Sequence, residues 1–276
     1  MTPRLRPMTR DDVEPAVTAI LADHWGDRRA WFEFTLGNAA CHSIVADADG
    51  EVIGTGVATV NGPVAWIGTI WVARDHRRRG LGAALTDAVA DIATAEGATT
   101  LLLVATDRGR PLYERSGFEV QTWYRTFEAP GLGAAADEAL RPFRPDDLDA
   151  MAALDRAATG EDRRLVLDGL ATPTGTRVLE ASDGDLRGFV VRAPWGGGAT
   201  VAPGLDDGLT IVEARRRRSP PEKRVRCGIL LENEAGAEAL ERAGWTEAWR
   251  APRLVRGASM TWHPEQVWGQ FNHAMG

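Results

Sequence analysis

The chain repeats parts of its own sequence at a nearly constant spacing. LRPMTRDDVEPA at 5–16 returns as LRPFRPDDLDAM at 140–151, DGEVIG at 49–54 returns as DGDLRG at 183–188, and ERSGF at 114–118 returns as ERAGW at 241–245. Ordered self-similarity of this kind indicates duplicated folding units. The sequence therefore predicts two domains of similar fold, over 1–130 and 137–276, joined by the glycine-containing segment EAPGLGAAADEA at 128–139.

Composition excludes several classes of protein. The net charge of −7 and the pI near 5.4 argue against a general nucleic-acid binder. The two cysteines, Cys41 and Cys227, and the five histidines form no pattern typical of a disulfide framework or a metal site. No apolar stretch approaches the length of a membrane span, and the N-terminus has no apolar leader. We expect a cytoplasmic protein with no metal, no membrane partner and no nucleic-acid partner.

The first half of the chain predicts a succession of strands and helices. HSIVADADGEVIGTGVATV at 42–60 is typical of a hairpin, and VAWIGTIWV at 64–72 is typical of a further strand. Apolar residues at helical spacing after residue 80 predict a helix that ends near Gly97. TTLLLVAT at 99–106 predicts a buried strand, and RPLYERSGF predicts a short helix with Gly117 at its end.

The segment DHRRRGLGAAL at 75–85 connects a predicted strand to the start of a predicted helix. Unpaired backbone N–H groups and the positive end of the helix dipole favour an anion there, and glycines let it approach closely. The three arginines add charge-assisted hydrogen bonds, so the segment predicts a pyrophosphate site. The absence of Gly-Lys-Ser/Thr excludes a Walker loop, and Leu85 breaks the dinucleotide fingerprint. A structural turn with solvated arginines remains the alternative.

Arg77-x-x-Gly80-x-Gly82 after a strand, followed about 30 residues later by Tyr113-x-x-x-Gly117-Phe118, resembles a known family. The pattern is similar to the acetyl-CoA-binding core of the GCN5-related N-acetyltransferase (GNAT) superfamily, and the resemblance covers about residues 4–128. It extends to a tandem form whose second, degenerate half often carries Gly-x-Asp-Arg, here the segment GEDR at 160–163. The resemblance implies an α/β (α+β) fold, with two tandem domains that are each a mixed, mostly antiparallel twisted sheet flanked by helices.

The resemblance also implies a function. The protein is expected to transfer an acetyl group from acetyl-CoA directly to a primary amine of a small molecule, amino acid or peptide, without a metal. The cofactor-binding residues implied are Ile70, Trp71, Val72, Arg77, Arg78, Arg79, Gly80, Leu81, Gly82, Ala83, Thr106, Gly109, Leu112 and Tyr113. A backbone N–H group of the strand 70–72 would polarise the acetyl carbonyl. A non-catalytic acyl-CoA-sensing protein of the same fold is the alternative, and a nucleic-acid-binding protein is the weakest reading.

Tyr113 matches the family tyrosine that protonates the departing thiolate, although it could instead be a packing residue. Asp23, His24 and Glu33 are candidates for the general base, and none of them is assigned. The acceptor-contact candidates are Trp25, Trp31, Glu33 and Asp162. Core packing for the tryptophans, solvation for Glu33, and an N-cap or local ion pair for Asp162 are the alternatives. The identity of the amine and the oligomeric state stay open.

A second run of arginines, RRRR at 215–218, has no glycine pair beside it. Residues 205–218 correspond to the phosphate loop region of the first half but lack Gly-x-Gly. We therefore expect one coenzyme per chain, a solvated turn at 215–218, and a second half that completes the acceptor pocket.

Overall fold

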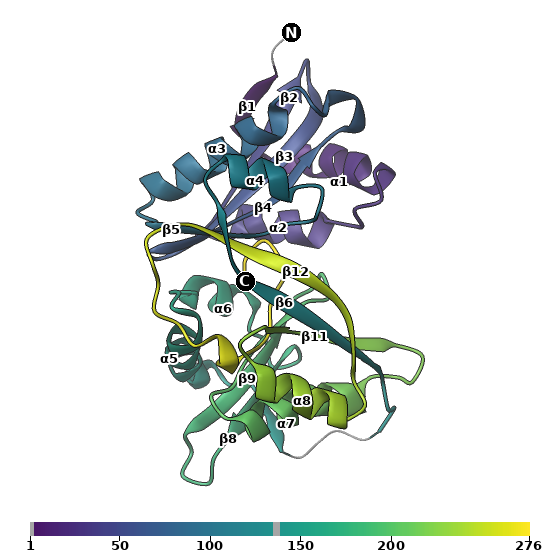
Figure 1. The fold of residues 1–276 in the computed structure, drawn as a ribbon, viewed down its shortest axis with the longest axis vertical. Helices are drawn as coiled ribbons and strands as arrows, with labels where there is room; N and C mark the ends of the chain where they lie inside the picture. Colours follow the sequence, from purple (N-terminus) through teal and green to yellow (C-terminus); the bar gives the residue numbers. More distant parts are fainter. Residues whose placement is uncertain (1–2, 135–138) are drawn as a thin grey trace. The chain divides into compact units, whose positions relative to one another are not determined.

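A computed structural model describes residues 3–134 and 139–276 of the protein (Figure 1). The chain forms two compact units. Unit 1 holds the chain up to Val120 together with Leu254–Ser259 and His273–Met275, and unit 2 holds Gln121–Arg253, Met260–Asn272 and Gly276. Helices flank mixed and antiparallel sheets in both units, so the predicted α/β (α+β) class is confirmed.

The division of the chain differs from the expected domains at 1–130 and 137–276. Strand β6 (Glu119–Pro130) begins in unit 1 but pairs along Tyr124–Pro130 with β11 (Arg224–Leu230), so its ladder of hydrogen bonds belongs to unit 2. The expected linker at 128–139 therefore starts inside a strand, and its residues 135–138 lie outside the described residues.

The sheet of unit 1 is mixed. Its strands, in order of pairing, are β1 (Arg4–Pro7), β2 (Cys41–Ala48), β3 (Glu51–Asn61), β4 (Val64–Val72) and β5 (Thr100–Val104), with the end of β12 (Thr246–Gly257) next to β5. Neighbours from β1 to β4 are antiparallel, whereas β4 and β5 are parallel. Asp49 and Gly50 connect β2 to β3 with φ values of 55° and 89°, as a two-residue hairpin turn requires. The predicted hairpin is confirmed.

Four helices and two short 3-10 turns complete unit 1. They are η1 (Arg10–Asp12), α1 (Val13–Ala22), α2 (Arg29–Gly37), η2 (Arg74–His76), α3 (Leu81–Ala95) and α4 (Arg110–Arg115). Leu85 and Val89 of α3 are fully buried in a core shared with β2, β3, β4 and β5. Gly97 follows α3 with φ 97° and Gly117 follows α4 with φ 82°, so both predicted helix ends are confirmed.

Unit 2 holds an antiparallel sheet and a second ladder of strands. The sheet order is β13 (Val267–Gly269), β10 (Gly198–Val201), β9 (Leu186–Arg192), β8 (Thr176–Glu180) and β7 (Leu140–Pro142). In the second ladder β6 lies between β11 and β12. The helices and 3-10 turns are η3 (Pro145–Asp147), α5 (Leu148–Thr159), α6 (Arg164–Leu170), α7 (Leu205–Arg218), α8 (Glu234–Arg242) and η4 (Pro264–Gln266).

The sequence repeat reappears as a repeated ion-pair network. The network joins an arginine of β1 or β7 to an aspartate six residues later and to an acid on the neighbouring strand, β2 or β8. The members are Arg6, Asp12 and Asp47 in unit 1, and Arg141, Asp147 and Glu180 in unit 2. Each arginine donates to both carboxylate oxygens of its aspartate, at 2.7 and 2.8 Å in unit 1 and at 2.8 and 2.8 Å in unit 2. The two halves therefore share chemistry as well as sequence.

The second arginine run does not form the solvated turn expected for it. Arg215–Arg218 are the last turn of α7, where cationic side chains interact favourably with the negative end of the helix dipole. Arg216 donates to the carbonyls of Pro130 (3.2 Å) and Ala243 (2.7 Å) and lies over the Trp245 ring. These tertiary partners hold the segment in the helix.

Candidate functional site

The candidate site begins where two parallel strands of unit 1 separate. Strand β4 pairs with β5 only between Val64–Trp66 and Thr100–Leu102, yet β4 continues to Val72. In the part of the chain that the structure describes, the last residues of β4 thus do not pair with a residue of β5. Their backbone groups on that side are available to a ligand, at the carboxyl ends of parallel strands where α/β proteins commonly bind one.

A bulge interrupts β4 at Thr69. The register with β3 shifts between Thr55 and Val57, and Thr69 has φ 52°, which is uncommon for a β-branched residue. Thr55 Oγ1 donates to the Thr69 carbonyl (2.8 Å), and Trp31 Nε1 donates to Thr69 Oγ1 (2.9 Å). Backbone strain of this kind costs about 1–3 kcal/mol and tends to occur at functional sites. Sequence reasoning missed Thr69, because the segment reads as a regular strand.

The glycine loop presents free amides at the start of α3. Gly80 has φ 84°, and Ala84 is the first residue of the region to donate to a helical carbonyl, that of Gly80 (3.0 Å). The N–H groups of Leu81, Gly82 and Ala83 precede it and have no intrahelical acceptor. Together with the positive end of a 15-residue helix they form a concentrated donor site for an anion.

Gly82 has room for a side chain that it does not carry. A methyl group built there would lie 3.4 Å from Leu112 Cδ2 and 3.9 Å from Val72 Cγ2, both ordinary contacts, and its φ is not positive. The fold itself therefore does not require glycine at this position. The missing Cβ leaves the surrounding amides accessible, which fits the close approach of a pyrophosphate.

The side chain of Arg77 is bound within unit 1. Its Nε donates to the Val72 carbonyl (2.8 Å) and its Nη2 pairs with Asp23, which also accepts from Trp71 Nε1 (3.0 Å). Arg77 thus braces the loop against the end of β4 instead of pointing its guanidinium at solvent. Asp23 is fully engaged in this brace, which argues against its candidacy as general base.

The other arginines and base candidates near the loop are exposed. Arg78 and Arg79 lie at the surface, and Arg78 has φ 61°. His24 and Glu33 are also exposed, and His24 has φ 62°. Arg78 and Arg79 are therefore free to reach phosphate oxygens.

Helix α4 lies beside the glycine loop. Leu112 lies next to Gly82, since its Cδ2 would be 3.4 Å from a methyl group built there. The Gly109 N–H donates to Thr106 Oγ1 (3.1 Å) just before the helix starts. Tyr113 packs edge-to-face on Phe118, with ring centroids 6.3 Å apart. Burial raises the pKa of Tyr113 to about 12, so its hydroxyl is protonated at neutral pH. Among the described residues the hydroxyl has no hydrogen-bond partner.

The candidates for acceptor contact differ in their surroundings. Trp31 is 2% exposed and supports the bulge, whereas Trp25 is 40% exposed. Asp162 belongs to unit 2, where it pairs with Arg156 at 2.7 Å. The local ion pair considered for Asp162 is thus present, and an acceptor role remains a prediction.

The C-terminal segment reaches β4 next to the bulge. A methyl group on Gly68 would lie 2.2 Å from Ala274 Cβ, and Thr59 Oγ1 donates to the Ala274 carbonyl (3.3 Å). Burial lowers the pKa of the neighbouring His273 to about 4, so this imidazole is neutral at pH 7. Nothing in the sequence pattern pointed to these residues, because they lie about 200 positions from the strand they contact.

Metal and membrane signals were searched in residues 3–134 and 139–276. No group of three or more His, Cys, Asp or Glu side chains there is placed to hold a metal ion. No helix in the same ranges has the length and apolarity needed to cross a membrane.

Comparison with known proteins finds a family that resembles the first part of the chain. The model of the acetyltransferase (GNAT) family matches residues 7–118, which include the strands, the glycine loop and α4 described above. A putative acetyltransferase from Pyrococcus horikoshii has the same fold over 100% of this chain and 96% of its own, with a TM-score of 0.82 and 22% identity. Over these residues the chain is similar to the GNAT family.

The tandem arrangement of this chain is also found in solved structures. A tandem GNAT protein from the clavulanic acid biosynthesis pathway covers 94% of this chain and 99% of its own, with a TM-score of 0.60 and 16% identity. The predicted resemblance to a tandem GNAT protein is thus confirmed at the level of the fold. Acetyl-CoA is the acyl donor typical of the family.

One curated relative of this chain is the uncharacterized N-acetyltransferase YitH of Bacillus subtilis. It is 29% identical over 147 residues, which are 52% of this chain and 51% of the relative. The chain thus spans about half the length of the curated relative it matches.

Proposed function

We propose that the protein is an acetyl-CoA-dependent N-acetyltransferase that acts on a primary amine of a small molecule, amino acid or peptide. The observation that carries the proposal is Gly82, a position where the fold has room for a methyl group and the chain has none. It lies among three free amides at the start of α3, beside the helix that bears Tyr113.

In this proposal the amides of Leu81, Gly82 and Ala83 bind the pyrophosphate of the coenzyme. Arg78 and Arg79 add charge from the surface, whereas Arg77 acts through its backbone because its side chain is engaged with Asp23. The backbone of Ile70–Val72, past the point where β4 leaves β5, binds the pantetheine arm. Thr106, Gly109 and Leu112 form the wall contributed by the start of α4.

The chemistry assigned to the chain is limited to orientation and proton transfer. Acetyl-CoA supplies the activated acetyl thioester. A backbone N–H of β4 donates to the acetyl oxygen while the amine nitrogen bonds to the carbonyl carbon and the carbon–sulfur bond breaks. The Tyr113 hydroxyl gives its proton to the departing sulfur and regains one from water, and the attacking neutral amine gives up one N–H proton to water or to a base not yet assigned.

The test is an acetyl-CoA-dependent thiol-release assay over a panel of primary amines. Both cysteines of the chain are buried, and burial raises their pKa to about 12, so they give little background with a thiol reagent. We expect no thiol release without an amine and turnover with at least one amine class.

Two other outcomes are informative. Coenzyme binding without turnover on any amine would favour the non-catalytic acyl-CoA-sensing alternative. An absence of both binding and turnover would refute the proposal.

A further inference from the structure

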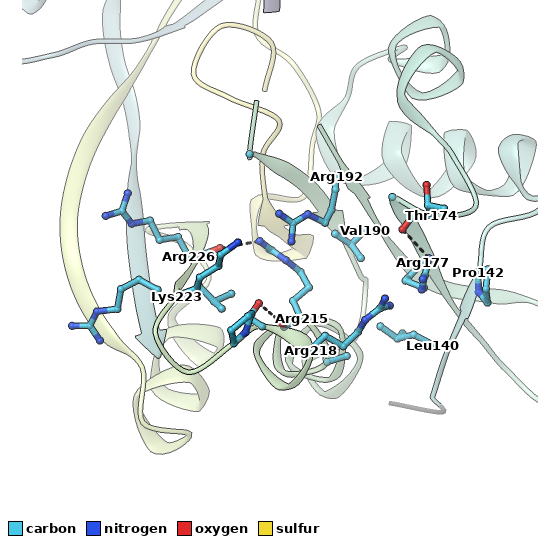
Figure 2. A pocket seen from close by; sticks show the side chains of 17 residues that line it. Leu140, Pro142, Thr174, Arg177, Val190, Arg192, Arg215, Arg218, Lys223 and Arg226 are labelled. Carbon is cyan, nitrogen blue, oxygen red and sulfur yellow. Dashed lines mark hydrogen bonds between the residues drawn. The ribbon is translucent and has the colours of Figure 1, made fainter. Parts of the chain in front are cut away.

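Unit 2 contains a strongly basic pocket that the proposed acetyl transfer does not use. Its volume is about 860 Å³, and Figure 2 shows the side chains of 17 residues that line it. They come from β7, β8, β9, the end of α7 and the start of β11. Six arginines and one lysine are among them, and no aspartate or glutamate in the described part of the chain lines it.

Most of these cations have no acidic partner among the described residues. Arg224 and Arg226 lie 3.5 and 3.3 Å from Glu128. The other five make no ion pair with a carboxylate in residues 3–134 or 139–276; they are Arg177, Arg192, Arg215, Arg218 and Lys223. Such a concentration of positive charge is unusual in a chain of net charge −7, and it produces a strong local potential for an anion.

One buried hydrogen-bond donor of Arg215 has no acceptor in the described part of the chain. Its Nη2 donates to the Arg226 carbonyl (3.2 Å), but its buried Nε has no hydrogen-bond partner among the described residues. Burial and the charge of Arg192 lower the pKa of Arg215 to about 10. A buried donor without an acceptor destabilises a protein unless a ligand supplies the acceptor.

The opposite wall is held in place by backbone contacts. Arg177 Nη1 donates to the carbonyls of Pro173 (2.8 Å), Thr174 (3.3 Å) and Thr176 (2.8 Å). Burial and the charge of Arg218 lower the pKa of Arg177, so the two cations act on the same space. In Figure 2 the side chains of Arg177 and Arg218 extend toward one another, as do those of Arg192 and Arg215.

Stabilisation of a helix dipole does not account for this arrangement. It explains arginines in the last turn of α7, but Arg177 and Arg192 come from strands β8 and β9. The space between the charges is lined by apolar side chains such as Val190 and Val225 and by the hydroxyls of Thr174 and Ser219. A volume of about 860 Å³ is that of a small-molecule site.

We propose that this pocket binds a small molecule that carries two or more phosphate groups. Arginine forks match phosphate oxygens in bidentate geometry, and two pairs of arginines face the cavity. The site differs from the coenzyme site, because it lies at the C-terminal end of α7 and contains no helix N-terminus.

The test is calorimetric titration of the full chain with inorganic pyrophosphate, ATP and citrate. We expect pyrophosphate and ATP to bind at the basic pocket, in addition to any binding at the glycine loop of unit 1, with citrate at least about tenfold weaker at the pocket because carboxylates carry less charge per group. Tighter binding of ATP than of pyrophosphate would indicate that the apolar lining also holds a nucleoside.

The decisive variant is Arg192→Glu with Arg218→Glu, since both side chains are exposed and the fold does not depend on them. We expect it to lose about 30-fold or more in affinity for both phosphate ligands. Arg217→Glu is the control for the helical member of the pair, because it makes the charge change of Arg218→Glu in the same helical turn without lining the pocket. Gly82→Ala tests whether the ligand uses the loop of unit 1 instead. Both controls should bind within about threefold of the wild type.

Four results would overturn the proposal. They are no binding by the wild type, full binding by the double variant, equal binding of citrate, and binding of a duplex oligonucleotide more tightly than ATP. Arg192→Ala alone, checked by circular dichroism, serves if the double variant does not fold, and it should still weaken pyrophosphate.

Discussion

Replacing Gly82 by alanine tests whether this glycine is required for the stability of the fold or for the binding of the coenzyme. The new methyl group meets only Leu112 and Val72, at 3.4 and 3.9 Å, so the unliganded protein has no reason to lose stability. Alanine in a helix is favoured over glycine by about 0.5–1 kcal/mol, so the melting temperature should stay equal or rise slightly.

The same methyl group should weaken the binding of acetyl-CoA. It stands where phosphate oxygens must approach the amides, and each hydrogen bond to a charged group is worth about 1.5–3 kcal/mol. Loss of one such bond corresponds to a Kd about 10- to 150-fold higher. At a coenzyme concentration of 100 times the wild-type Kd, stabilisation should fall from about 2.7 kcal/mol to about 0.4 kcal/mol for a 100-fold loss.

Calorimetric titration measures the Kd, and thermal unfolding with and without coenzyme measures the stabilisation. Gly37→Ala is the control, because a methyl group there meets nothing within 4 Å and Gly37 ends a different helix. A Gly82→Ala Kd within about threefold of the wild type would refute the reasoning. A large drop in the melting temperature of the unliganded variant would show that glycine is needed for the fold.

Three further predictions follow from the structure. Tyr113→Phe should lower kcat on the order of 10²-fold and leave the Kd for acetyl-CoA unchanged. Because the pKa of Tyr113 is about 12, the wild-type kcat should show no loss from Tyr113 ionisation below about pH 11. An unchanged kcat of the variant in a chemistry-limited reaction would show that Tyr113 is a packing residue. Hydrogen bonds from Arg6 lower the pKa of Asp12 to about 2. The ionised Asp12 therefore adds about 2 kcal/mol to the free energy of unfolding above pH 4, and this stabilisation is lost as the pH falls through 2. An Asp12→Asn variant should lack that part of the acid-unfolding curve. Titration with coenzyme should give about one tight site per chain, whose affinity alanine at Arg217 and Arg218 leaves unchanged because the basic pocket is not the coenzyme site; Arg216 is retained for its contacts to Trp245. Two sites of equal affinity would contradict the reading of the second arginine run.

Local patterns in the sequence were enough to predict the elements that carry the site. Strand β4 runs from Val64 to Val72 as its apolar, β-branched composition indicates. The helix after Gly80 ends at Ala95, close to Gly97, the glycine expected near its end. These features depend on neighbouring residues only, so they can be read without knowledge of tertiary structure. The tandem arrangement was predictable because the chain carries two copies of one pattern.

Other parts of the site depend on contacts between distant residues. The positive φ of Thr69 depends on hydrogen bonds from Thr55 and Trp31, and the engaged state of Arg77 depends on Asp23 at the end of α1. No spacing in the sequence indicates such partners. The direction of Arg215 into the basic pocket was equally hidden, since a run of four arginines reads as solvated unless the surrounding strands are known.

The discontinuity of unit 1 bears on how the protein is made. Residues up to Val120 leave the ribosome long before Leu254–Ser259, which complete the sheet beside β5. At about 5–20 residues per second, synthesis of the intervening chain takes about 7–27 s. During that interval β5 is an open sheet edge, which is a template for pairing with other chains. Expression of the first half alone would make that transient state permanent, so residues 1–120 alone should aggregate where the full chain does not.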